Sequence, residues 1–468
     1  MSIKSKLWSK TTRKTFVKAF QKKRPTKDLI AKNFNLLIIT QFFPPDYAAT
    51  GQLIQELANQ LGQKNIQVNI FTGQPGYAYK QKKAPAKEIR NNVAIQRSRA
   101  SRFWSQRIRG KTLNGIVFAL RSACYLFKNA HKNDLVILTT APPFLAIIGF
   151  LAKCFLGINY ICLVYDLYPE VAVELGVISQ NNLVTKLWNK INTIVWNKSK
   201  KVVVLSETMK QRIIAKNLFV PSKISVIHNW ADAEWIKPLK KQKNWFARQY
   251  GINHKFTVLY SGNFGLCHDL DTVLGAMKIL KNQPVQFVFI GAGAKHDICR
   301  QRVLEFNLKN SIFLPYQDRD KLPYSLTACD LALVSIAPGL EGIIVPSKVY
   351  GIMAAGKAIA AICESHSYLR KLITDAECGA YFNNNCSEDL AKFILTLASN
   401  PELTARMGIS GRNYMQKNFT PQIIAQKYCE ILDIDSSFNV IDNKLERKKV
   451  SQDKFLPTRY IKQRYTNI

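Results

Sequence analysis

Short apolar runs alternate with longer amphipathic stretches along most of the chain. The runs are typical of buried strands, and the stretches between them have the spacing of helices. In the first half, the predicted strands are Asn35–Thr40, Val68–Thr72, Val93–Arg97, Leu135–Thr140, Tyr160–Tyr165 and Lys201–Ser206. Predicted helices between them include Gln52–Leu61, Thr112–Ala130 and Leu183–Ser199. This alternation predicts a mostly parallel sheet with helices on both faces.

The same alternation starts again after residue 255. The predicted strands there are Phe256–Tyr260, Gln286–Ile290, Ser311–Leu314, Leu331–Ser335, Ala358–Cys363 and Ala380–Phe382. Two helices, Pro401–Met415 and Pro421–Leu432, close the series. The predicted fold class is α/β, with two doubly wound Rossmann-like domains that face each other across a cleft. Ligands of such sheets bind at the carboxyl ends of the strands.

These patterns also predict where the chain divides. Residues 231–255, between the two series, are polar, charged and poorly periodic, which favours a linker. The expected division is a basic N-terminal arm (1–34), a first domain (35–230), the linker (231–255), a second domain (256–420), a final helix (421–435) and a basic tail (436–468).

The charge balance is strongly basic, with 67 Lys and Arg against 31 Asp and Glu. Such a surface attracts polyanions, although a general surplus of basic residues without any partner is the alternative. In the N-terminal arm, Trp8, Phe16 and Phe20 are interleaved with lysines. Aromatic and basic residues together favour an anionic membrane surface over nucleic acid, since each basic residue near the headgroups contributes about 1 kcal/mol.

One apolar segment, Phe144–Val164, is long enough to span a membrane, but Lys153 and Asn159 interrupt it. A lysine in the bilayer centre is costly, so we expect a buried helix followed by a strand, with a re-entrant or interfacial element as the alternative. The ten cysteines form no C-x-x-C pair and the six histidines no cluster. The sequence therefore predicts no disulfide framework, no metal site and a reducing, cytoplasmic compartment.

Three glycine-bearing turns follow predicted strands of the second domain. They are Ser261–Gly265 (SGNFG), Gly291–Gly293 (GAG) and the loop that leads to Pro346, Ser347 and Lys348. Each one alone is an ordinary turn of an α/β protein. Together they would lie at one edge of one sheet and offer backbone N–H groups, a helix N-terminus and a lysine to a phosphate. We therefore predict a nucleotide diphosphate site there.

The first domain offers a different group of residues. The strand that ends at Tyr165 is followed by Asp166, Leu167, Tyr168, Pro169 and Glu170. A carboxylate at a strand end can orient a hydroxyl group or accept its proton. The alternative is an Asp that caps a helix and a solvated Glu.

Taken together, these motifs resemble family-4 glycosyltransferases of the GT-B fold. The matching features are a Pro-Pro…Gly loop after the first strand, DLYPE, HNWAD, SGNFG, FIGAG and PSKVYGIMAAGKA. Within the family they are most similar to the subgroup associated with colanic-acid, O-antigen and other exopolysaccharide assembly. The resemblance covers residues 35–435. It implies a nucleotide-sugar donor in the second domain, an acceptor in the first, retention at the anomeric carbon, no metal or other cofactor, and a final helix that crosses back to the first domain.

The resemblance also assigns roles to residues. It implies that Gly262, Asn263 and Gly265 border the diphosphate and that Gly291 and Gly293 border the nucleotide. Ser347 and Lys348 would bind phosphate, and Gly51 would approach the donor from the opposite side. Asp166 would face the acceptor and the reacting carbon, with Glu170 beside it. The implied catalytic residues are Asp166, Lys348 and Glu341.

The sequence departs from the family pattern in two places. Many relatives carry two glutamates eight positions apart, and Gly351 and Ile343 occupy those positions here. Glu341 is two positions out of register and fits only if the loop is rearranged. The Arg/Lys pair that often neutralises the departing diphosphate is also missing, and Asn263 and His268 stand in that region.

We expect a hexosyltransferase that acts at the inner face of the cell membrane as a peripheral protein. It would move a sugar from a UDP- or GDP-sugar to a lipid-linked or polysaccharide acceptor. One alternative is a GT-B protein that has lost catalysis and binds membranes or nucleic acid. Another is a GT-B enzyme of different chemistry, such as a nucleotide-sugar epimerase.

Overall fold

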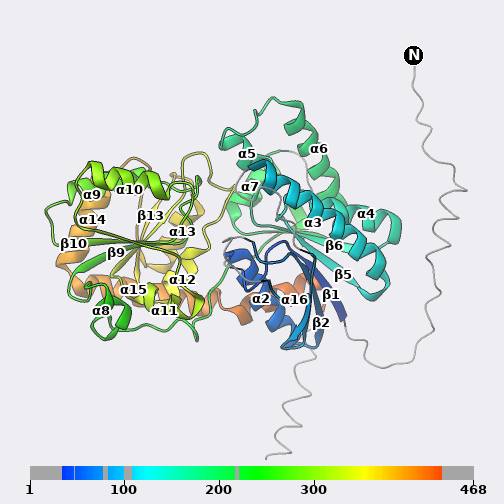
Figure 1. Ribbon diagram of the computed structural model, residues 1–468, viewed down its shortest axis with the longest axis horizontal. Helices are drawn as coiled ribbons and strands as arrows, with labels where there is room; N and C mark the ends of the chain where they lie inside the picture. The colour runs from blue at the N-terminus through cyan, green and yellow to red at the C-terminus, as the bar shows by residue number, and fades with distance from the viewer. Residues whose placement is uncertain (1–33, 47, 77–82, 100–107, 217–220, 435–468) are drawn as a thin grey trace, which may run out of the picture.

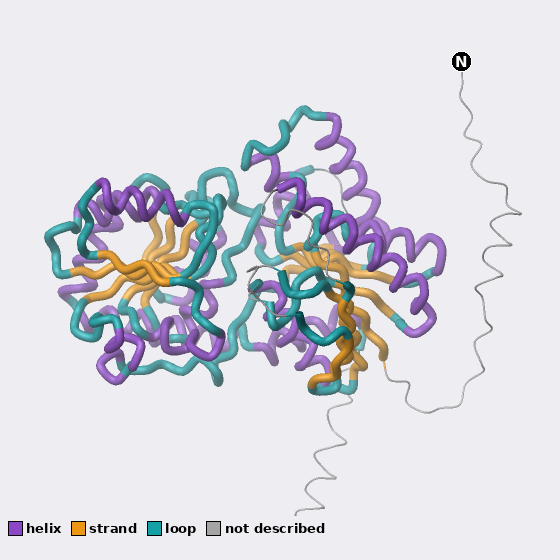
Figure 2. The backbone as a smooth tube through the Cα atoms, viewed as in Figure 1, coloured by secondary structure: helices purple, strands orange, loops and turns teal. Residues whose placement is uncertain are grey.

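The computed structural model describes residues 34–46, 48–76, 83–99, 108–216 and 221–434. The predicted basic arm, apart from residue 34, and the predicted basic tail lie outside these residues. The described chain forms two units, each built around its own sheet, with the second unit on the left and the first on the right in Figures 1 and 2. The α/β prediction is confirmed.

The first sheet has eight strands in the order β3-β4-β2-β1-β5-β6-β7-β8. The strands are β1 (Phe34–Ile39), β2 (Ile66–Thr72), β3 (Lys87–Arg90), β4 (Val93–Arg97), β5 (Leu135–Thr139), β6 (Asn159–Val164), β7 (Lys201–Val204) and β8 (Ile224–Val226). All neighbours pair in parallel except β3, which pairs antiparallel with β4 at the edge. The central strands are buried on both sides, which explains their continuous apolar runs.

Helices cover both faces of this sheet. They are α2 (Ala49–Gly62), α3 (Ile108–Asn129), α4 (Ala146–Leu156), α5 (Glu170–Glu174), α6 (Leu183–Lys198) and α7 (Glu207–Ala215), with 3₁₀ turns η1 (Ala130–Lys132) and η2 (Pro221–Lys223). Helix α2 lies on one face, whereas α3, α4 and α6 lie on the other (Figure 1). The strand order reverses between β1 and β5, which makes their carboxyl ends the switch point of the sheet.

The second sheet has six parallel strands in the order β11-β10-β9-β12-β13-β14. They are β9 (Phe256–Ser261), β10 (Val285–Ile290), β11 (Ser311–Leu314), β12 (Leu331–Ser335), β13 (Ala358–Ile362) and β14 (Gly379–Phe382). The helices are α9 (Asp271–Ile279), α10 (His296–Glu305), α11 (Leu322–Thr327), α12 (Lys348–Ala354), α13 (Tyr368–Ala376), α14 (Ser387–Ser399) and α15 (Pro401–Asn418), with the 3₁₀ turn η4 (Arg319–Lys321). Here the strand order reverses between β9 and β12.

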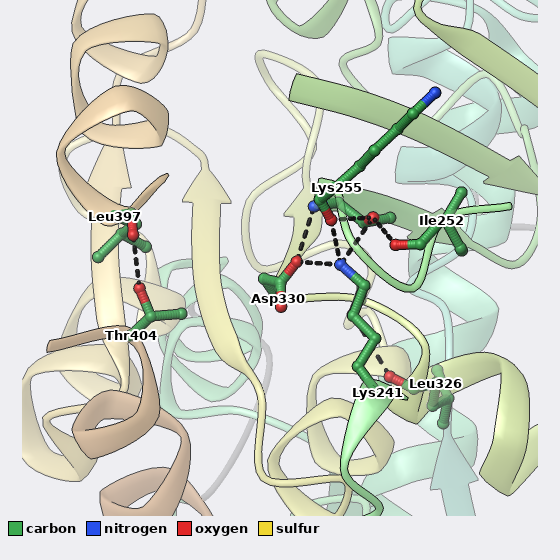
Figure 3. A network of polar contacts seen from close by, with 9 residues as sticks. Lys241, Ile252, Lys255, Leu326, Asp330, Leu397 and Thr404 are labelled. Atoms are coloured by element: carbon green, nitrogen blue, oxygen red, sulfur yellow. Dashed lines mark hydrogen bonds and ion pairs between the residues drawn. The ribbon is translucent and has the colours of Figure 1, made fainter. Parts of the chain in front are cut away.

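The segment between the sheets is packed rather than loose. It contains the 3₁₀ turn η3 (Lys241–Lys243) and the helix α8 (Trp245–Gln249). Lys241 is buried, and its Nζ donates to Asp330, to the Lys255 carbonyl and, at 3.0 Å, to Thr257 Oγ1 (Figure 3). This network ties the segment to the start of β9 and to the residue before β12.

The last described helix, α16 (Pro421–Leu432), returns to the first sheet and packs against α2. Residues 144–164 contain α4 followed by β6, so the helix and strand predicted there are confirmed. The expected burial is wrong for the outer side of α4, where Phe155 is 59% exposed. Among the described residues, no helix combines the length and apolar character needed to cross a bilayer.

Candidate active site

A cleft with a volume of about 820 Å³ lies between the two sheets. This volume is within the range of about 300–1,000 Å³ that is usual for small-molecule sites. Its walls come from the carboxyl ends of β1, β5 and β6 in the first unit and of β9, β10 and β11 in the second. Of the predicted site residues, those that line it are Asp166, Gly262, Asn263, Gly265, Ser347 and Lys348. The cleft therefore lies at the switch points of both sheets.

Lys348, the first residue of α12, has a buried amine in this wall. Its Nζ lies 3.8 Å from the ring centroid of Tyr260 and has no hydrogen-bond partner among the described residues. A buried ammonium without a counter-ion is costly, and burial lowers the pKa of Lys348 to about 7. An anion that entered the cleft here could form an ion pair with Lys348, whose amine has no acceptor among the described residues.

The SGNFG turn after β9 lies against this lysine. A Cβ built on Gly262 would be 3.5 Å from Lys348 Nζ, so the turn and the amine are in close contact. The Tyr260 hydroxyl donates to the Asn263 carbonyl at 2.8 Å, which fixes the turn from below. Gly262, at φ +129°, is in a region that favours glycine.

Gly291 and Gly293 do not line the cleft. A Cβ on Gly291 would be 1.9 Å from the Gly262 carbonyl oxygen, and a Cβ on Gly293 would be 2.5 Å from Asn263 Oδ1. Both glycines therefore allow the two turns to pack together. The structure gives them a supporting position behind the predicted diphosphate site.

Asp166 lies on the opposite wall, directly after β6. The Thr140 hydroxyl accepts hydrogen bonds from the backbone N–H groups of Tyr165 and Asp166, at 3.1 and 3.3 Å. Desolvation of its carboxylate raises the pKa of Asp166 to about 6. A carboxylate with this pKa is well placed to accept or share a proton near neutral pH.

Ser347 and Glu341 come from the loop after β12 and are placed differently. Ser347 precedes α12 and lines the cleft, whereas Glu341 is 1% exposed and does not. Glu341 Oε1 accepts hydrogen bonds from Thr208 Oγ1 at 2.6 Å and from the Tyr368 N–H at 3.2 Å. This carboxylate fastens the loop to α7 of the first unit and lies away from the cleft wall.

The same loop is held by backbone contacts across the two units. Arg212 donates to the carbonyls of Glu341 and Gly339, at 2.6 and 3.0 Å, and the Leu167 N–H donates to the Ile343 carbonyl at 2.9 Å. Because Leu167 follows Asp166, this contact joins the two walls of the cleft directly beside the candidate carboxylate.

Gly51 and Glu170 also lie outside the cleft lining. A Cβ on Gly51 would be 2.9 Å from the backbone of Phe42, so this glycine allows α2 to approach the loop after β1, while Thr50 and Gln52 beside it line the cleft. Glu170 begins α5 and forms an ion pair with Lys216, the residue directly after α7. Its carboxylate is engaged within the first unit.

The absence of the family's Arg/Lys pair leaves few basic side chains in the described cleft wall. His268 lines the cleft, but burial, with smaller contributions from Lys348 and Lys295, lowers the pKa of His268 to about 3, so this side chain is neutral. Among the described residues that line the cleft, Lys348 and Arg319 are the basic ones. Within the described cleft wall, these two side chains are the sources of positive charge for a departing diphosphate.

A polar cluster at the cleft was not predicted from the sequence. Arg319 donates to Glu56 Oε1 at 2.7 Å and lies 5.0 Å from the Trp235 ring centroid. Trp230 Nε1 donates to the other oxygen, Glu56 Oε2, at 3.0 Å. Burial raises the pKa of Glu56, although the charge of Arg319 opposes this shift. The cluster joins α2, the connecting segment and η4, which are far apart in sequence. Trp230, in the HNWAD motif, is its one member that belongs to a motif noted in the sequence.

Two family models match the chain in succession. Residues 50–235 match Glycosyltransferase Family 4, and residues 242–414 match Glycosyl transferases group 1. The two matches divide where the chain passes from the first sheet to the second.

Curated relatives and solved structures agree with these models. The chain is 26% identical to the probable glycosyltransferase WbjE of Pseudomonas aeruginosa over 69% of this chain and 80% of the relative. It is 28% identical to the putative colanic acid biosynthesis glycosyl transferase WcaI of Escherichia coli over 36% of this chain and 40% of the relative. The structure of Anabaena Alr3699/HepE in complex with UDP and glucose superposes with a TM-score of 0.66, at 16% identity, over 86% of this chain and 99% of that one.

The two facing sheets, the cleft at their switch points and these matches define a glycosyltransferase of the GT-B fold. The chain joins a glycosyltransferase family 4 domain to a group 1 glycosyltransferase domain, and one of its relatives, WcaI, is described as a putative colanic acid biosynthesis enzyme. The predicted family and enzyme class are thereby confirmed.

Proposed function

We propose that this glycosyltransferase moves a sugar from a UDP- or GDP-sugar to a lipid-linked or polysaccharide acceptor, with retention at the anomeric carbon. The donor would lie against the second domain, and the acceptor would enter from the first. The observation that carries the proposal is the buried, unpaired amine of Lys348 beside the SGNFG turn, facing the candidate carboxylate side of the cleft. The UDP and UDP-glucose complexes of Anabaena Alr3699/HepE support a nucleotide-sugar donor.

In this proposal Lys348 stabilises the departing diphosphate. Negative charge develops on the leaving group as the glycosidic bond to the phosphate breaks. A positive charge held in a desolvated site therefore stabilises the transition state more than it stabilises the bound donor. A bound diphosphate would raise the pKa of Lys348 above about 7 and make the amine fully charged. Ser347 and the backbone of the SGNFG turn would then orient the phosphates.

Asp166 would act on the acceptor side. Its carboxylate lines the cleft on the side of the first domain, from which the acceptor would enter. A pKa of about 6 allows it to accept a hydrogen bond from the attacking hydroxyl group at neutral pH. Glu341, which is buried, and Glu170, which is paired with Lys216, are supporting residues in this scheme. Glu341 would support the loop after β12, and Glu170 would support α5.

We propose a cytoplasmic, peripheral location at the inner face of the cell membrane. The basic composition of the chain supports contact with anionic lipid, and a lipid-linked acceptor would be presented at that surface.

A panel of UDP- and GDP-sugars tests the proposal. A donor present at one hundred times its Kd stabilises the folded protein by about 2.7 kcal/mol, which a thermal-denaturation assay detects. Slow hydrolysis of the same nucleotide sugar then tests for turnover. Stabilisation without turnover on any acceptor would favour a binding protein that has lost catalysis, an alternative to which Gly351 at the family's glutamate position gives some support. Interconversion of sugars would indicate an epimerase.

A further inference from the structure

Three neighbouring helices of the first domain present apolar side chains to the outside. Helix α4 packs between α3 and α6, and all three lie on the same face of the first sheet (Figure 1). Among the described residues, nineteen large hydrophobic side chains are exposed, and nine of them belong to these three helices. The concentration on one face distinguishes them from the single exposed apolar residues that every protein has.

Helix α3 is apolar on two sides. Phe118 and Leu126 are buried against the sheet, as expected for a covering helix. The stripe formed by Ile116, Leu120 and Cys124 lies on the opposite side, where Leu120 is 63% exposed. The spacing of four residues makes this a continuous stripe along the outer face.

Helices α4 and α6 continue this surface. On α4, Leu151 and Phe155 are one turn apart and exposed, Phe155 by 59%. On α6, Leu183, Leu187 and Ile194 are exposed on the outer side, at spacings of four and seven residues. Because neighbouring helices turn their outer sides in the same direction, these residues form one surface.

The charges on these helices are all positive. The sequences of α3, α4 and α6 contain no Asp or Glu. Lys128 of α3 and Lys186, Lys190 and Lys198 of α6 are exposed beside the apolar stripes. A surface that mixes long basic and large apolar side chains, without any acid, complements a layer with anionic headgroups over a hydrocarbon interior.

We propose that the outer faces of α3, α4 and α6 dock onto the surface of an anionic lipid bilayer. The three helices would lie in the plane of the interface, with Leu120, Phe155 and Leu187 below the headgroups and the lysines among the phosphates. The inference rests on the membrane location in the proposed function and deepens it by placing attachment in the folded first domain.

Charge decides between the possible occupants of this face. A second copy docked through the same face would bring its own lysines against Lys186 and Lys190, and the N-terminal arm, with eleven Lys and Arg against one acid in residues 1–32, would do the same. Like charges that meet in a contact are repulsive. Anionic lipid is the occupant whose charge fits.

The apolar part of the proposal is tested with the full chain and vesicles of phosphatidylcholine, with or without phosphatidylglycerol. The variant carries Leu120→Gln, Phe155→Gln and Leu187→Gln. A matched control carries Ile279→Gln, Leu304→Gln and Ile409→Gln, which are similarly exposed on the second domain. We expect the first variant to lose at least about tenfold in vesicle affinity and the control to bind like the wild type. Equal binding by both variants overturns the proposal.

The lysines are tested separately. Lys186→Gln with Lys190→Gln should weaken binding to anionic vesicles by about fivefold for each lysine, whereas Lys281→Gln with Lys309→Gln on the second domain should not. Equal binding of the wild type to vesicles without phosphatidylglycerol contradicts the charge argument. A wild type that is dimeric without vesicles, with the Leu120, Phe155, Leu187 variant monomeric, shows that a second copy covers the face and also overturns the proposal.

Donor binding, measured without vesicles, separates this inference from the proposed function. Stabilisation of the variants by UDP-glucose shows that they are folded with an intact cleft. If no nucleotide sugar stabilises even the wild type while vesicle binding behaves as expected, the proposed donor reaction fails and the docking face stands.

Discussion

The amine of Lys348 allows a quantitative test of the donor site. In the free protein its pKa is about 7, because the amine is buried without a partner. In the complex a diphosphate would hold the proton, so the free lysine must take up a proton when the donor binds above that pH. The protonated fraction of the free lysine falls from about three quarters at about pH 6.5 to about 3% at about pH 8.5. The affinity for UDP-glucose should therefore fall about 25-fold over this range, or about 1.9 kcal/mol.

Isothermal titration with UDP-glucose at several pH values measures this change, and the heat in buffers of different ionisation enthalpy reports the proton taken up. Lys348→Met keeps most of the length of the unbranched side chain and removes the amine. The variant should bind more weakly at about pH 6.5 and lose the pH dependence. Lys309→Met, on an exposed lysine of the second domain, should keep both. A wild-type affinity that is constant across this range, or a pH dependence that survives in Lys348→Met, would refute the assignment of the diphosphate to Lys348.

The free protein provides a second readout of the same lysine. An unfolded lysine keeps its proton up to about pH 10.5, whereas folded Lys348 loses it near pH 7, so the unfolded state binds more protons between these values. The contribution of this residue to stability therefore rises with pH from about 7 to about 10.5. At about pH 6, Lys348→Met should be more stable than the wild type by about 1–3 kcal/mol, because it no longer buries an unpaired charge. A less stable variant at that pH would contradict the pKa.

Three further predictions concern the other candidate residues. Asp166→Asn should lower kcat by about 10²–10⁴-fold with little change in UDP-glucose affinity. In the wild type, kcat/KM should rise with pH through about 6, because the carboxylate ionises there. An unchanged kcat in the variant would show that Asp166 takes no part in the reaction. Glu341→Ala should lower the free energy of unfolding by about 1–3 kcal/mol, because the Thr208 hydroxyl loses its acceptor. The KM for the donor should stay within about twofold of the wild-type value. Normal stability together with lost activity would indicate that Glu341 is catalytic instead. Gly291→Ala should displace the Gly262 carbonyl and so weaken donor binding, although Gly291 does not line the cleft. A variant with wild-type donor affinity would show that the SGNFG turn does not depend on the turn at Gly291.

Much of the fold follows from local patterns. The central parallel strands, such as β5, β10, β12 and β13, are fully buried, so each of them is an apolar run that stands out in the sequence. The edge strand β3 gives no such signal, because its residues, Lys87 to Arg90, are mostly exposed and polar. It is a strand through its antiparallel pairing with β4 and through the ion pair between Glu88 and Arg97, neither of which a local pattern contains.

The site was predictable in part for the same reason. Gly262, Asn263 and Asp166 lie within two residues of a strand end, and Lys348 follows the loop after β12. Because the carboxyl ends of parallel strands meet at one edge, their place in the cleft follows from the order of elements. The cluster of Glu56, Arg319 and Trp230 joins elements that no local pattern connects.

The sequence by itself determined that the chain is a two-domain α/β glycosyltransferase, because the periodicity of its apolar residues and the motifs at its strand ends are local properties. The tertiary structure decided which residues face the cleft. Glu341 looks catalytic in the sequence, yet it is enclosed by Thr208 and the Tyr368 backbone. Leu120 has the spacing of a core residue, yet it faces outwards. The physical reason is that periodicity shows which side chains lie on the same face of a helix or strand, whereas tertiary packing decides whether that face contacts the core, the cleft or the solvent.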